Sequence, residues 1–143
     1  MEMKVVSWGD VARSAPDLGR HVEERMGEPK VCYLATLRRD GWPRVHPVLV
    51  RFRDGRMVVT MYPNSPKGHD IRRNGRYAVH GMVEDPYGGR GEVLMTGTAV
   101  ATDATPADIE RGWVAFELLV GEVLATQYNS VGLEPVFMRW RPS

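Results

Sequence analysis

The sequence is poor in cysteine and lysine and contains no long apolar run. Its single cysteine, Cys32, cannot form a disulfide within the chain, so a reducing compartment is the simpler expectation. No uncharged stretch approaches the ~20 residues that span a bilayer, and residues 1–4 lack the basic-then-apolar order of a signal peptide. We therefore expect a cytoplasmic protein without a membrane partner.

The composition is that of one globular domain. The chain has 143 residues, of which 43% are hydrophobic and 26% charged, and no linker, repeat or low-complexity segment divides it. At this length a single core buries roughly two thirds of the surface of the unfolded chain, so neither a disulfide nor a structural metal is required. We expect one domain that covers residues 1–143.

Basic residues are concentrated in the middle of the chain. The net charge is +1, yet residues 38–76 carry ten cations and three anions, a balance of +7, and the remainder is −6. This distribution favours a local anionic ligand over a nucleic-acid partner, because the basic segment lacks interleaved aromatic residues. Arginines on the solvent side of two-faced strands are the alternative interpretation.

Hydrophobic periodicity predicts an initial helix and then mainly strands. Residues 7–26 are expected to be helical, because Leu18, Val22 and Met26 recur every four residues. β-favouring stretches predict six strands, over residues 31–37, 45–52, 57–61, 77–83, 92–101 and 136–140. Pro47 interrupts the second strand and marks an edge or a bulge there, and Gly97 marks a bulge in the fifth.

Three connecting segments complete this prediction. A short helix is expected from Ser65 to Asn74, and a loop over residues 85–91. A third helix is expected to open at Thr105–Pro106 and to run to about Leu119 or on to Gln127. Six antiparallel strands with flanking helices predict an α+β fold built on a barrel.

The tetrapeptide Asn64-Ser65-Pro66-Lys67 is the strongest local motif. Ser65 fits an N-cap and Pro66 the first helical position, which leaves outward-pointing N–H groups and the positive end of the helix dipole for an anion. Lys67 adds a mobile charge, although the chain otherwise prefers arginine (sixteen) to lysine (three). The motif fits a phosphate monoester, and an ordinary capped surface helix is the alternative.

The remaining reactive side chains define no catalytic centre. The histidines have no metal-ligand spacing, so no metal site is expected; they are His21, His46, His69 and His80. His46, beside Pro47, fits a pocket wall, a satisfied polar residue at a barrel rim or a haem ligand. Cys32 lies within a predicted strand as a small buried residue, and the four tryptophans are too scattered for a base-stacking surface.

Three segments resemble the pyridoxamine 5′-phosphate oxidase-like superfamily of flavin-binding split barrels. Residues 34–45 (LATLRRDGWPRV) are similar to its first hairpin, and residues 65–76 (SPKGHDIRRNGR) to its phosphate-binding turn and helix. Residues 95–99 (MTGTA) resemble its fifth-strand signature. The resemblance covers about residues 31–103 and implies a six-stranded antiparallel split β-barrel.

The resemblance also implies a cofactor site and a partner. In this family FMN lies between two protomers, so a homodimer is expected. Carried over by position, the cofactor-binding residues are His46, Pro47, Val48, Leu49, Val50, Arg51, Thr60, Met61, Ser65 and Lys67. Two positions depart from the true oxidases: Pro66 replaces an arginine, and Glu92 replaces a glutamine near the flavin ring.

The expected function is that of an FMN-dependent oxidoreductase acting on an unidentified small molecule. Residues 134–143 do not match the segment that holds pyridoxal phosphate in the true oxidases, so an authentic pyridoxamine phosphate oxidase is not expected. A deazaflavin-dependent reductase is the first alternative, for which Arg51, Arg53 or Arg72 would hold a polyanionic tail. A non-catalytic flavin- or haem-binding protein is the second. The sequence singles out no catalytic acid or base.

Overall fold

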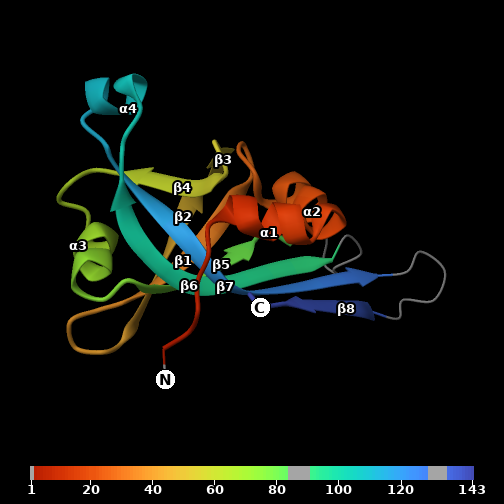
Figure 1. The fold of residues 1–143 in the computed structure, drawn as a ribbon. Coiled ribbons are helices and arrows are strands. Elements are labelled where there is room, and N and C mark those ends of the chain that lie inside the picture. The colour runs from red at the N-terminus through yellow and green to blue at the C-terminus, as the bar shows by residue number, and fades with distance from the viewer. Residues whose placement is uncertain (1, 84–90, 129–134) are drawn as a thin grey trace.

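Two short helices begin the chain, and a set of antiparallel strands follows (Figure 1). The computed structural model describes residues 2–83, 91–128 and 135–143. Helix α1 (Trp8–Ser14) and helix α2 (Pro16–Met26) take the place of the single helix expected over residues 7–26. The chain leaves helical geometry at Ala15 (φ −140°), because the residue before a proline avoids the α region, and Pro16 then opens α2.

Within the described ranges, eight strands form one antiparallel sheet. They are β1 (Val31–Leu37), β2 (Pro43–Leu49), β3 (Arg51–Arg53), β4 (Arg56–Met61), β5 (Arg76–Gly81), β6 (Glu92–Thr102), β7 (Val114–Tyr128) and β8 (Pro135–Trp140). Their order is β2-β1-β5-β6-β7-β4-β3, with β8 added on β7. Only Val50 separates β2 from β3, the two ends of this order, so the chain itself closes the barrel. The predicted α+β antiparallel barrel is confirmed, with eight strands instead of six.

The break in the second predicted strand lies at Val50 and not at Pro47. Pro47 is an ordinary member of β2, opposite Tyr33 of β1. A proline is tolerated there because β2 lies at the end of the strand order, where one side of its backbone needs no ladder partner. Val50 leaves the ladder and forms a parallel bridge with Gly27.

Strand β7 occupies the region for which the sequence predicts a long helix, so that prediction is wrong. Helix α4 covers only Pro106–Glu110, and the chain is extended from Val114. The pairing of β6 with β7 shifts register between Thr96 and Gly97, which leaves Gly121 without an opposite residue. Gly97 therefore lies at a bulge, as predicted, and the extra residue is on the neighbouring strand.

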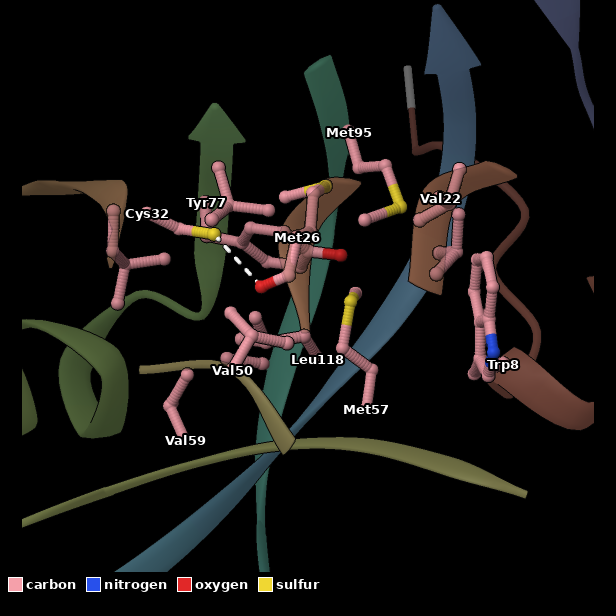
Figure 2. Packing of buried hydrophobic residues seen from close by; sticks show 14 of the residues in the cluster. Trp8, Val22, Met26, Cys32, Val50, Met57, Val59, Tyr77, Met95 and Leu118 are labelled. Atoms are coloured by element: carbon pink, nitrogen blue, oxygen red, sulfur yellow. Dashed lines mark hydrogen bonds between the residues drawn. The ribbon is translucent and has the colours of Figure 1, made fainter. Parts of the chain in front are cut away.

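The barrel interior is filled by aliphatic, methionine and aromatic side chains (Figure 2). Trp8, Val22 and Met26 come from α1 and α2, and Met57, Met95 and Leu118 come from the strands; all are buried. The Sγ of Cys32 donates to the carbonyl oxygen of Met26 at 3.3 Å, and burial raises the pKa of this thiol to about 11. The predicted buried role of Cys32 is therefore confirmed.

Helix α3 (Pro66–Arg73) matches the short helix predicted after Ser65. In Figure 1, α3 and α4 lie at the end of the barrel where β4 stops, whereas α1 and α2 lie at the other end. No helix among the described residues is long and apolar enough to cross a membrane. The loop predicted over residues 85–91 lies outside the described residues, apart from Gly91.

Candidate functional site

A groove of about 400 Å³ opens beside α3, at the junction of β2, β3 and β4. Its lining residues are Val31, Pro47, Val48, Leu49, Arg51, Thr60, Lys67 and Trp113. Six of them belong to the ten cofactor-binding residues predicted from the sequence. Val31 and Trp113 are additions that sequence reasoning did not select.

The other four predicted residues lie around the groove without lining it. Val50 is fully buried and Met61 is nearly so, and both belong to the core. His46 is half-buried on β2, and Ser65 caps α3. The structure thus brings the start of α3 together with the consecutive strands β2 and β3, while two of the predicted side chains face the barrel interior.

The first turn of α3 presents a backbone donor that has no partner in the part of the chain that the structure describes. The Ser65 Oγ accepts from the N–H of Gly68 at 3.2 Å, and the Ser65 carbonyl oxygen accepts from the N–H of His69 at 3.1 Å. Pro66 has no N–H. The N–H of Lys67 therefore remains at the positive end of the helix, where a bound anion is favoured.

The side chain of Lys67 supplies a second donor at the same place. It is half-buried, and burial lowers the pKa of its amine below the ordinary value. Within the described residues, no carboxylate or carbonyl group accepts a hydrogen bond from this amine. A partly desolvated cation without a counterion is unfavourable by itself, and an anionic ligand would relieve that cost.

A buried carboxylate fixes α3 to the strands. Asp70 accepts from Thr36 Oγ1 of β1 at 2.8 Å, from Arg44 Nε of β2 at 2.7 Å and from Arg73 at 2.9 Å. Burial alone would raise the pKa of Asp70, but these hydrogen bonds outweigh it, and the pKa lies below its ordinary value. Asp70 therefore stays ionised and fixes the helix that carries Lys67.

The pKa of His46 is shifted by burial and by the neighbouring charged groups. Desolvation lowers the pKa of its imidazole most, and the cations Lys67 and Arg44 lower it further, against an opposing effect of Asp70. The ring is therefore neutral near pH 7. A neutral imidazole near Lys67 leaves that amine as the mobile charge of the turn.

Arg51 is paired within the chain. Its guanidinium donates to Asp108 at 2.9 Å and to Glu28 at 3.0 Å, and Arg53 lies 3.6 Å from the same Asp108 carboxylate. Asp108 is fully buried and also caps α4 through Thr105. The charge of Arg51, predicted from the sequence to be available to a ligand, is thus compensated by two carboxylates.

Glu92 lies in a different groove. That groove, of about 390 Å³, also contains His80 and Arg139 and runs over β5 to β8. Within one chain, Glu92 is therefore absent from the residues that line the groove of Lys67. Lys67 and Arg51 are the titratable side chains among the described lining residues of the latter.

Three solved structures with the same fold share little sequence identity with this chain. PhzG from Burkholderia lata 383, in complex with tetrahydrophenazine-1-carboxylic acid, matches at a TM-score of 0.59 and 14% identity, over 93% of this chain and 92% of that chain. An F420 reductase matches at 0.55 and 18%, over 68% and 91%. A heme binding protein from Mycobacterium smegmatis matches at 0.63 and 15%, over 85% and 55%. At such identities the likeness shows the fold alone.

The strand order and the flanking helices are those of a split-barrel fold, as the sequence resemblance implied. A match to the family described as Pyridoxamine 5'-phosphate oxidase extends over residues 18–129. The chain belongs to this family. No curated protein matches the sequence.

Proposed function

We propose that the chain is a single-domain, homodimeric oxidoreductase that binds FMN in the groove beside α3 and acts on a small molecule. The observation that carries this proposal is Lys67. Its half-buried amine has no acceptor among the described residues and lies next to a free N–H at the start of a capped helix. These two donors suit a phosphate monoester, and membership of the family makes the FMN phosphate the preferred ligand.

The remaining groove residues suit the other parts of FMN. Apolar Val31, Pro47 and Leu49 offer a surface for a flat ring, and the hydroxyl of Thr60 offers one polar contact. FMN, when bound, would supply the hydride chemistry, while the protein would anchor the phosphate, orient the ring and exclude water. The lining residues therefore fit the cofactor, and the proposal requires no acid or base from the described groove.

An uncovered apolar face supports the dimer. Tyr33, Val45 and Leu49 project outward from β1 and β2 with 45%, 62% and 40% of their surface exposed. Register places Tyr33 opposite Pro47, and Val31 opposite Leu49, so the face runs directly into the groove. A second copy that covers this face would also close the open side of the groove.

The pairing of the arginines favours FMN over a deazaflavin coenzyme. Arg51 and Arg53 share the buried carboxylate of Asp108, and Arg72 donates to the carbonyl oxygen of Pro63 and lies over the ring of Phe116. A polyanionic tail would have to displace these partners. A single phosphate on Lys67 displaces none.

The test is a titration of the purified protein with FMN, followed by its absorbance. One FMN should bind per chain, and Lys67→Ala should weaken binding at least tenfold, because a charge-assisted hydrogen bond contributes about 1.5–3 kcal/mol. Lys4→Ala is the matched control, since Lys4 bonds the carbonyl oxygen of Ser143 away from the groove. Binding of the deazaflavin alone, of haem alone, or of FMN with equal affinity by Lys67→Ala would overturn the proposal.

A further inference from the structure

Trp113 is the one aromatic side chain in the described lining of the groove. It lies between α4 and the start of β7, two residues after Arg111, the C-cap of α4, and no local sequence motif connects it to Lys67 or Thr60. The fold brings it to the groove because β7 pairs with β4: Met61 lies opposite Val114, the residue after Trp113. An aromatic side chain that is half-buried at the wall of a groove is able to contact a ligand bound there.

Three neighbours hold the indole in place. The guanidinium carbons of Arg51 and Arg111 lie 5.9 and 5.0 Å from its ring centroid, and the ring of Tyr62 meets it edge-on at 6.4 Å and 88°. Cations over an aromatic ring and edge-to-face pairs are both attractive arrangements. These contacts fix the orientation of the Trp113 side chain at the wall of the groove.

A buried carboxylate fixes the position of Arg51, one of these three neighbours. Arg51 is fixed by Asp108, whose carboxylate is fully buried, accepts from Arg51 at 2.9 Å and closes the capping box of α4 with Thr105. Hydrogen bonds outweigh the effect of burial and keep this carboxylate ionised, with a pKa below its ordinary value. One buried group therefore determines both the position of α4 and that of the guanidinium beside the indole.

We infer that Trp113 packs against the ring of the bound flavin, and that Asp108 positions Trp113 through Arg51. This inference rests on the proposed function. It gives the groove two chemically different contacts for a flavin: Lys67 for the phosphate, and Trp113 with the apolar residues Pro47 and Leu49 for the ring. The arginines near the groove support the wall and leave the phosphate to Lys67.

Riboflavin, which lacks the phosphate, separates the contribution of Lys67 from that of Trp113 in a binding experiment. Trp113→Leu should weaken FMN and riboflavin by the same factor, about tenfold. Lys67→Ala should weaken FMN and leave riboflavin unchanged. Trp113→Phe should restore most of the affinity, and Trp42→Leu is the matched control, because Trp42 is 69% exposed in the turn between β1 and β2.

The outcomes distinguish the two proposals. If neither flavin binds the unaltered protein, the proposed function fails. If both bind and Trp113→Leu leaves riboflavin affinity unchanged, or weakens FMN only, Trp113 does not contact the ring and the inference is overturned. Thermal unfolding of each variant shows that the compared samples are folded.

The role of Asp108 requires a double-mutant cycle. Asp108→Asn should weaken both flavins in the unaltered background and have no effect on affinity in the Trp113→Leu background, because the residue acts through Trp113. Equal effects in both backgrounds would assign Asp108 a purely structural role and overturn this part. If Asp108→Asn does not fold, Arg51→Met breaks the same link and takes its place in the cycle.

Discussion

Replacing Asp70 by alanine should destabilise the fold by about 3 kcal/mol. The Asp70 side chain is only 3% exposed and accepts three hydrogen bonds. Its loss leaves the buried hydroxyl of Thr36 without its partner, which costs about 1–3 kcal/mol. Arg44 and Arg73 retain 30% and 32% exposure and turn to water, so we add only about 0.5 kcal/mol for each.

Urea denaturation measures this free energy of unfolding directly. The matched control is Asp17→Asn, because Asp17 pairs with Arg20 at 96% exposure and should change stability by less than about 1 kcal/mol. A loss below 1 kcal/mol for Asp70→Ala would refute the reasoning, because the three contacts would then not survive in solution.

The same carboxylate predicts a pH dependence. The pKa of Asp70 is lowered in the folded state from its ordinary value of 3.8, so its stabilising effect is complete above that value. The effect is lost as the pH falls through the lower folded-state pKa. The stability difference between the unaltered protein and Asp70→Asn should therefore be constant above about pH 5 and shrink below pH 3.8. A difference that grows on acidification would contradict the assignment.

Two further predictions concern the barrel itself. Gly97→Ala should lower the free energy of unfolding by about 3 kcal/mol or prevent folding, because the added Cβ would lie 1.9 Å from the carbonyl oxygen of Leu119. Gly41→Ala has open space around it and should lower stability by only about 1 kcal/mol, because its φ is positive. Thermal unfolding compares the two variants. Cys32 should resist iodoacetamide at pH 8 in the folded protein, because its thiol is buried and its pKa is about 11. It should react once urea unfolds the chain. Rapid labelling of the folded protein would contradict the burial of this thiol.

Local sequence signals predicted the elements that depend on local interactions. β1 covers the predicted residues 31–37, and Ser65 caps α3 through Gly68 as the Ser-Pro pair indicates. The hairpin after β1 also turns where Asp40-Gly41 predicts it, with the N–H of Arg38 bonded to the carbonyl oxygen of Trp42. These features need no knowledge of distant residues.

β7 shows how a bulge conceals a strand. Its buried residues alternate as Phe116, Leu118 and Val120 before Gly121, and as Val123 and Ala125 after it. The extra residue shifts the phase, so Phe116, Val120 and Val123 reproduce the spacing of four and three that is typical of a helix. The leucines, glutamates and alanines of this segment also favour a helix, and the pairing with β6 and β4 outweighs that preference.

The site was predictable in its strands and its capped turn, and not in its long-range partners. Arg51 meets Asp108, 57 residues further along the chain, and no pattern within the basic segment reveals that its charge is compensated from outside. Trp113 reaches the groove only because β7 pairs with β4. Such contacts are properties of the tertiary fold.

The break at Val50 has a consequence for how ligand binding and folding are linked. The residues on either side of it, Leu49 and Arg51, line the groove, while Val50 itself is fully buried where the two ends of the strand order meet. A ligand bound between Leu49 and Arg51 would stabilise the junction between β2 and β3, where the chain connects the two ends of the strand order. A bound ligand should then slow the unfolding of the barrel. Substitutions of Leu49 or Arg51 should alter both the ligand specificity and the unfolding rate.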